Sequence, residues 1–145
     1  MSSLVIDASM AVACCVGEPE VASVADAVRE ELQGGQALVP AIWPAEVANA
    51  LLVKERRGHL QPADTQALFT YHGLLPVVVD EARPAAVFSK VAELARVHGL
   101  TSYDASYLEL AKRAALPLAS LDDNLRRAAS NEGVKLFEPT KRETS

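Results

Sequence analysis

Short apolar segments alternate with longer helical segments along the whole of this chain. The short segments are the expected strands, and they lie at 3–7, 36–40, 75–80, 116–120 and 134–139. The segments between them carry apolar residues at helical spacing, often with proline near the start and glycine at the end, and they lie at 10–17, 18–35, 43–58, 62–73, 83–99, 100–115 and 122–133. Strands that alternate with helices pair in parallel. The pattern therefore predicts an α/β fold in which a central parallel sheet of about five short strands is flanked by helices.

The composition fits one globular domain. The chain has 145 residues, of which 50% are hydrophobic and 23% charged, so it can bury a core of its own. We expect a single domain over residues 1–139 and a polar tail over residues 140–145. The start "MSSLVIDAS" lacks the regions of a signal peptide, and no apolar run is long enough to span a bilayer. These features predict a cytoplasmic protein without a membrane partner.

Two helical segments carry an acidic residue on their apolar side. Asp104 heads a stripe that continues with Leu108, Ala111 and Ala115. The charged residues of the same helix are expected on the opposite, solvated face, and they are Glu109, Lys112 and Arg113. Glu46 repeats the feature, because Ala50 and Val53 follow it at helical spacing. Burying an unpaired carboxylate costs free energy, so acids in these positions need a partner.

Four acids are expected at the same end of the sheet. Asp7 ends the first strand, Glu46 and Asp104 lie in first turns of helices, and Asp122 directly follows a strand. In open α/β sheets the functional crevice lies beyond the carboxyl ends of the strands. Crowded carboxylates repel one another unless a proton or a cation lies between them. A hard divalent cation, Mg²⁺ or Mn²⁺, suits such oxygen ligands, and the sequence therefore predicts a metal site here.

The residues alone leave alternatives open. Acids are also common at helix starts, where they cap free N–H groups, and Thr101 and Asp104 have the spacing of a capping box. Asp122 has the position of an N-cap, or could pair with Arg126. Three further acids also follow expected strands, so their spacing allows them to lie at the same end of the sheet; they are Asp80, Glu81 and Asp123.

Four stretches of the chain resemble the motifs of a known family. They are "LVIDAS", "PAEVANALL", "LTSYDASYLELA" and "LASLDDNL", and they resemble the motifs of the PIN-domain ribonucleases in their order and approximate spacing. The resemblance covers essentially the whole chain. It is strongest to the VapC-type toxins of prokaryotic toxin–antitoxin (VapBC) pairs, and it implies a PIN-like fold.

The resemblance also implies roles for individual residues. It assigns catalysis and metal binding to the four acids Asp7, Glu46, Asp104 and Asp122. It adds supporting residues, which are Ser9, Ser120 and Asp123, with Asn124 as a further candidate. It removes Asp80, because the family has no catalytic acid after that strand, which lies toward the edge of the sheet.

The implied activity is Mg²⁺- or Mn²⁺-dependent hydrolysis of RNA phosphodiesters. The implied partners are an RNA substrate, a VapB-type antitoxin and a second copy of the chain in a homodimer. The net charge of −5 is compatible with an anionic substrate without supporting one. Lys54, Arg56 and Arg57 could contact RNA phosphates, but cations at a helix end also complement its carbonyls.

Three other functions remain open from the sequence. The chain could be an RNA-processing PIN nuclease without an antitoxin. It could also be a catalytically silent α/β domain that binds a metal and RNA. A phosphotransfer domain using Asp7 ranks lower, because the lysine expected after a late strand is missing.

Overall fold

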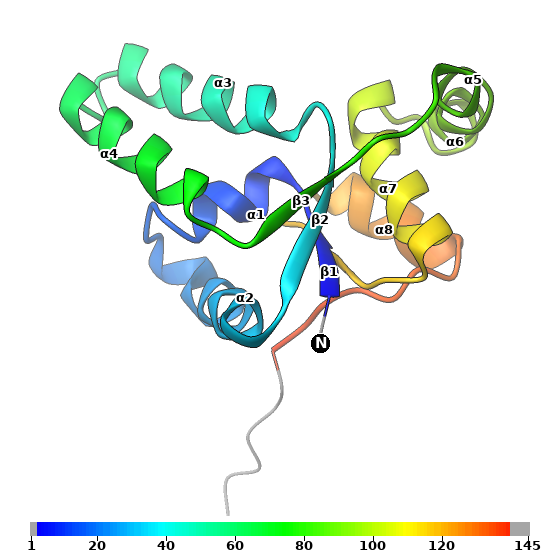
Figure 1. Cartoon of the computed structure of the whole chain (residues 1–145), viewed down its shortest axis with the longest axis horizontal. Helices are drawn as coiled ribbons and strands as arrows, with labels where there is room; N and C mark the ends of the chain where they lie inside the picture. The colour runs from blue at the N-terminus through cyan, green and yellow to red at the C-terminus, as the bar shows by residue number, and fades with distance from the viewer. Residues whose placement is uncertain (1–2, 140–145) are drawn as a thin grey trace, which may run out of the picture.

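A parallel sheet of four strands forms the centre of the computed structural model, which describes residues 3–139 (Figure 1). The strands are β1 Ser3–Ile6, β2 Gln36–Pro40, β3 Val77–Asp80 and β4 Leu118–Ala119. Their order across the sheet is β3-β2-β1-β4, so β3 lies at an edge as expected. Because every pairing is parallel, the carboxyl ends of all four strands lie at the same end of the sheet.

The strand β1 lies inside the sheet and sets the position of the residue after it. Residues 4–6 are fully buried and apolar, as expected for a strand that is covered on both faces. Val5 pairs with Leu38 of β2 on one side and with Leu118 of β4 on the other. Asp7 therefore leaves the middle of the sheet at its carboxyl end.

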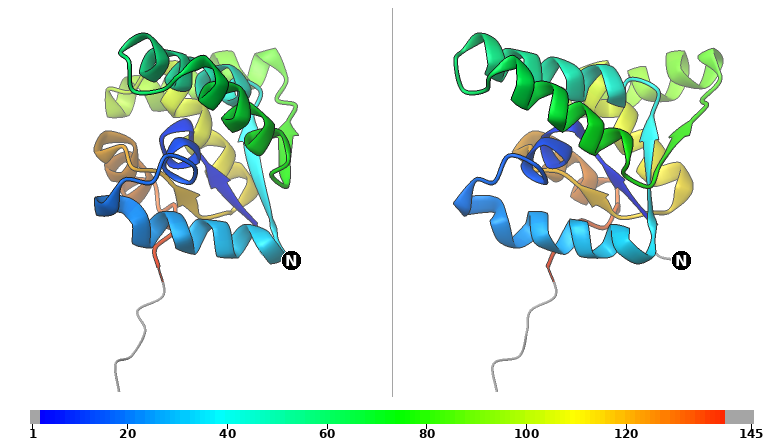
Figure 2. Two further views of the ribbon diagram at one scale, coloured as in Figure 1. Left: turned by 90° about the vertical axis from the view of Figure 1, so that its left-hand side faces the viewer. Right: turned by 60° about the vertical axis from the view of Figure 1, so that its left-hand side comes forward.

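Helices cover both faces of the sheet. They are α1 Ala8–Ala13, η1 Pro19–Val21, α2 Ala22–Gly34, α3 Trp43–Arg56, α4 Pro62–Gly73, α5 Pro84–Ala86, the π-turn η2 Val87–Val91, α6 Ala92–His98, α7 Ser102–Ala114 and α8 Asp123–Asn131. The helices α1 to α4 lie on one side of the sheet, and α6 to α8 lie on the other (Figure 1). The pair α3 and α4 runs side by side above α1, with α2 below it (Figure 2). Between residues 3 and 139, none of these helices combines the length and the apolar character that crossing a bilayer requires.

The α/β fold with a parallel sheet is confirmed, but the last predicted strand is wrong. Residues 134–139 meet the sheet through one isolated bridge, between Leu136 and Leu118. Two backbone hydrogen bonds accompany it, from Leu118 N to the Lys135 carbonyl and from Phe137 N to the Leu118 carbonyl. The neighbour β4 has only two residues, so it offers no length for a longer ladder. The predicted tail, 140–145, lies outside the described residues.

The predicted helix over 83–99 is present but interrupted. Its helical turns widen to a π-turn at Val87–Val91 and return to an α-helix at Ala92. Single π-turns inside α-helices occur frequently at functional sites, and this one lies beside a cavity described below.

The apolar stripe of α7 is only partly as predicted. Leu108 and Ala111 are buried, whereas Ala115 ends the helix in the left-handed region, with φ 55°, and is exposed. The prediction of a solvated Glu109 is wrong, because its residue is only 6% exposed. Arg113, one turn later, donates to both oxygens of Glu109, at 2.8 and 3.2 Å, so this carboxylate is buried with its charge paired.

One ion-pair network joins three helices near the C-terminal end of α8. Glu132 accepts hydrogen bonds from His98 Nε2 at 2.8 Å and from Lys112 Nζ at 2.9 Å. These contacts hold the pKa of Glu132 below its usual 4.5. Glu132 therefore links the ends of α6, α7 and α8.

We expect Glu132→Gln to destabilise the protein by about 1 kcal/mol near neutral pH, because Lys112 is exposed to water although Glu132 and His98 are partly buried. The pKa is lower in the folded than in the unfolded chain, so the contribution is fully present above pH 4.5. It disappears as the pH falls through the lowered pKa. Urea unfolding of both proteins at several pH values tests this, and a stability gap that grows toward low pH would contradict it.

Candidate functional site

Asp7 is the most firmly held residue at the carboxyl end of the sheet. It caps α1, and its Oδ1 accepts hydrogen bonds from Met10 N at 2.9 Å and from Ser9 Oγ at 2.7 Å. Its Oδ2 accepts from Ser120 Oγ, which comes from the end of β4. The residue is 4% exposed. The side chain is therefore fixed from both neighbouring segments before any ligand binds.

The electrostatic surroundings of Asp7 oppose its ionisation. Burial raises its pKa, and the negative charge of Asp122 adds to that effect. The three hydrogen bonds act in the opposite direction, since they stabilise the carboxylate. Burial dominates, so the ionised form of Asp7 would be stabilised by a cation.

Asp122 begins α8 beside Asp7. Its Oδ1 accepts from Leu125 N at 2.8 Å, which makes it the N-cap. Its own N–H donates to Ser120 Oγ at 3.0 Å, and Leu121 N donates to Ser9 Oγ at 3.1 Å. The two serines named by the family resemblance therefore bridge the segments after β1 and β4. They position the acids through hydrogen bonds.

Glu46 lies in the first turn of α3, as predicted. Its Oε1 accepts a hydrogen bond of 2.6 Å from the hydroxyl of Tyr107, which is 1% exposed. Burial raises the pKa of this tyrosine, and Glu46, Asp7 and Asp104 raise it further. The hydroxyl therefore stays protonated and acts as a donor to Glu46.

Asp104 brings the four acids into one cluster. It lies half-buried in the first turn of α7, where Thr101 caps the helix by accepting from Asp104 N at 3.1 Å. Burial raises the pKa of Asp104, and the charges of Asp122, Asp7 and Glu46 raise it as well. Charges act this way only at short range in a protein. The four predicted acids therefore share one electrostatic environment.

The donor set fits a hard divalent cation. Carboxylate and hydroxyl oxygens are the ligands that Mg²⁺ and Mn²⁺ prefer, and a cation would remove the repulsion that raises the pKa of Asp104. In residues 3–139, however, no three His, Cys, Asp or Glu side chains already converge as a ready-made metal site. The protein hydrogen bonds described above hold oxygens of Asp7, Glu46 and Asp122, so the acids are gathered without being converged on one point.

Other predicted residues lie outside the cluster. Asp123 and Asn124 are exposed in the first turn of α8. The cations Lys54, Arg56 and Arg57 lie at the opposite end of α3 from Glu46, about 12 Å or more along the helix axis. Lys54 Nζ approaches Glu18 at 3.9 Å.

Tyr107 is the residue in contact with the acids that the sequence analysis does not identify. It lies three residues after Asp104 and thus on the same side of α7. That spacing was a usable signal, but a buried tyrosine beside an apolar stripe is ordinary in a core. Only the contact with Glu46, 61 residues away in the chain, connects it to the acids.

Fold and site together define an α/β domain with a cluster of acids at the carboxyl end of its parallel sheet. A family model for the PIN domain matches residues 4–131, and the chain belongs to this family, whose members are generally nucleases. Among solved structures it is similar to PAE2754 from Pyrobaculum aerophilum, with 24% identity and a TM-score of 0.67 over 88% of this chain and 84% of that one. It is also similar to FitAcB from Neisseria gonorrhoeae, with 18% identity and a TM-score of 0.54 over 96% of this chain and 99% of that one. These two similarities concern the fold. The comparison with curated proteins finds no match.

Proposed function

We propose that this protein is a Mg²⁺- or Mn²⁺-dependent endoribonuclease that acts as the toxin of a toxin–antitoxin pair. The observation that carries the proposal is the hydrogen-bonded placement of the acids at the carboxyl end of the sheet. Ser120 donates to Asp7 and accepts from the backbone of Asp122, and Tyr107, one turn after Asp104 in α7, donates to Glu46. Membership of the PIN family supports nuclease chemistry. The resemblance of the four motifs to VapC-type toxins supports the biological role.

The four acids would hold the metal, and the serines and Tyr107 would orient them. When bound, a divalent cation supplies charge neutralisation at the scissile phosphate and lowers the pKa of a coordinated water. Ser9 and Ser120 fix the rotamer of Asp7 by donating to its two oxygens. Tyr107 fixes one oxygen of Glu46, so the other is the one available as a ligand.

The experiment that tests this function is RNA cleavage by the purified full chain, freed of any antitoxin. We expect cleavage in Mg²⁺ or Mn²⁺, complete loss in EDTA, and recovery when metal is added back, because the site depends on the cation for its charge balance. Cleavage that continues unchanged in EDTA would contradict the metal mechanism. Binding of RNA without cleavage, with metal present, would favour the catalytically silent alternative.

The partners proposed are RNA, a VapB-type antitoxin and a second copy of the chain. The resemblance of the four motifs to VapC-type toxins supports both protein partners. A small gene that directly precedes this one and neutralises its toxicity on co-expression is the expected antitoxin. Cleavage without such a gene would favour an RNA-processing role.

A further inference from the structure

A cavity of about 280 Å³ lies beside the carboxylate cluster and is not part of it. Its walls come from the end of β2 and the chain after it, the end of β3, the π-turn η2 and residues 102–110 of α7. The residues that line it include Ile42, Asp80, Val87, Tyr103, Ser106 and Glu109. The walls are mainly apolar, and the polar groups are confined to a few positions, as is typical of a ligand pocket.

The cavity adjoins the cluster through two helix starts. Tyr103 lines the cavity, and Asp104, the next residue of α7, belongs to the cluster. Ile42 also lines the cavity, and its carbonyl accepts the backbone hydrogen bond of Glu46 at 3.0 Å. The cavity and the cluster are therefore neighbours at the starts of α3 and α7.

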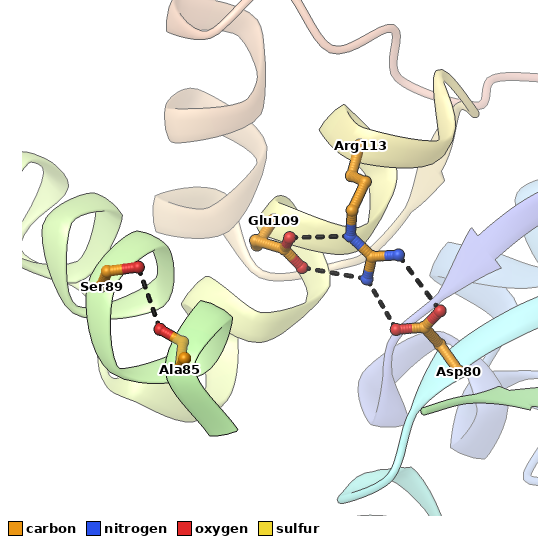
Figure 3. Close-up of polar contacts among 5 residues, drawn as sticks. All are labelled: Asp80, Ala85, Ser89, Glu109 and Arg113. Atoms are coloured by element: carbon orange, nitrogen blue, oxygen red, sulfur yellow. Dashed lines mark hydrogen bonds and ion pairs between the residues drawn. The ribbon is translucent and has the colours of Figure 1, made fainter. Parts of the chain in front are cut away.

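The polar end of the cavity carries an excess of negative charge. Arg113 donates to Glu109 with Nε at 2.8 Å and to Asp80 with its terminal nitrogens at 3.2 and 2.6 Å (Figure 3). One guanidinium thus faces two carboxylates, which leaves a net charge of about −1. Carboxylate oxygens accept more than one hydrogen bond. The cavity therefore favours an occupant that donates N–H groups, and it repels a phosphate.

Tyr103 supplies an aromatic surface in the same cavity as these acceptors. It is 55% exposed although it lines the cavity, so one part of the ring is open to solvent. Proteins recognise single-stranded RNA through its unstacked bases. These bases stack on aromatic side chains, and their edges form hydrogen bonds with the protein. A planar base, with faces that stack and N–H groups at its edge, matches the ring, the walls and the acceptors of this cavity.

We propose that the cavity binds a nucleobase of the RNA adjoining the cleaved phosphodiester, with Tyr103 stacking on it and Asp80 and Glu109 accepting from its N–H groups. The proposal rests on the proposed ribonuclease function and names a specificity pocket for it. Adenine, cytosine and guanine carry amino groups that suit carboxylate acceptors. Uracil presents a single N–H between two carbonyl oxygens, which the carboxylates repel, so it is the disfavoured base.

The test is an NMR titration of the full chain with free nucleosides in EDTA, which measures base binding without cleavage. We expect adenosine, cytidine or guanosine to shift the amide signals of residues 102–106 and 80–82. Uridine should bind more weakly than these nucleosides, by about tenfold at least. Tyr103→Ala should weaken the binding by about tenfold, the usual loss when a stacking ring is removed. Phe88→Ala is the matched control, because this ring is 79% exposed and does not line the cavity; its binding should be unchanged.

Each other outcome decides against one of the two claims. If no nucleoside shifts these signals, or if Tyr103→Ala binds as well as the wild type, the base pocket is wrong while metal-dependent RNA cleavage still supports the function. If nucleosides bind as expected but RNA is never cut with metal present, the proposed function is wrong and the base site stands. If N-acetylarginine amide shifts the signals and the nucleosides do not, the cavity takes a cationic side chain of a protein partner, and the proposal is overturned.

Discussion

Asp104→Asn is expected to abolish RNA cleavage and, in metal-free buffer, to leave the fold as stable as before or more stable. Loss of a residue that merely supports a metal ligand costs about 10–100-fold, so loss of a ligand itself should cost about 100-fold or more in kcat/KM. The neutral amide also removes a charge that Asp122, Asp7 and Glu46 repel. The gain in the free energy of unfolding should stay within about 1 kcal/mol, because the side chain is only half-buried and water screens the repulsion.

Three measurements on each protein check this expectation: RNA cleavage, urea unfolding in EDTA, and unfolding in Mg²⁺ or Mn²⁺. Metal should stabilise the wild type by binding the folded state, and this stabilisation should largely vanish in Asp104→Asn. Glu93→Gln is the control, since this acid is exposed on α6 and should keep activity and metal response. A variant that is inactive because it is destabilised in EDTA would show that Asp104 has a structural role.

Tyr107→Ala and Tyr107→Phe are expected to fail in different ways. The ring is almost fully buried, so removing it with alanine should cost about 3–5 kcal/mol and lower the Tm by roughly 10 °C. Phenylalanine keeps the ring and removes only the hydroxyl that donates to Glu46 Oε1. Its cost to stability should be about 1 kcal/mol. Because Glu46 loses its orienting donor, metal affinity should fall by about 10–100-fold.

Calorimetric titration with Mn²⁺ and thermal unfolding separate these two effects. The phenylalanine variant should recover most of its cleavage at saturating metal, because it acts through Glu46 and not on the RNA. Loss of activity that no metal concentration restores would contradict this positioning role. Wild-type metal affinity in Tyr107→Phe would show that the bond to Glu46 only supports packing.

The sequence predicted correctly those helices and strands whose bounds are determined by residues within the segment itself. The segments 36–40 and 62–73 match β2 and α4 residue for residue, because proline, glycine and apolar spacing mark both. The segment 134–139 failed because its pairing depends on β4, and nothing in "VKLFEP" shows that this neighbour has only two residues. The solvated position predicted for Glu109 was wrong for a similar reason. Arg113 bonds both Glu109 and Asp80, and Asp80 lies far away in the chain.

For the candidate site, the sequence likewise predicted the acids but not the contacts between distant residues. The rule that parallel strands end together placed Asp7, Glu46, Asp104 and Asp122 at one end of the sheet, although each of them alone also suited a helix cap. The same rule admitted Asp80, Glu81 and Asp123, and the family resemblance was needed to select the four acids. Asp7 and Asp122 in fact cap α1 and α8 while they belong to the cluster, so the two roles are compatible. The hydrogen bonds that orient the acids could not be predicted, because they join residues as far apart as Asp7 and Ser120.

That separation has a consequence during synthesis of the chain. Asp7 is made 113 residues before Ser120, which fixes it, and Asp122 comes after both. A growing chain therefore holds an incomplete set of acids until the start of α8 has left the ribosome. The candidate site can therefore form only after nearly all of the described chain has been made.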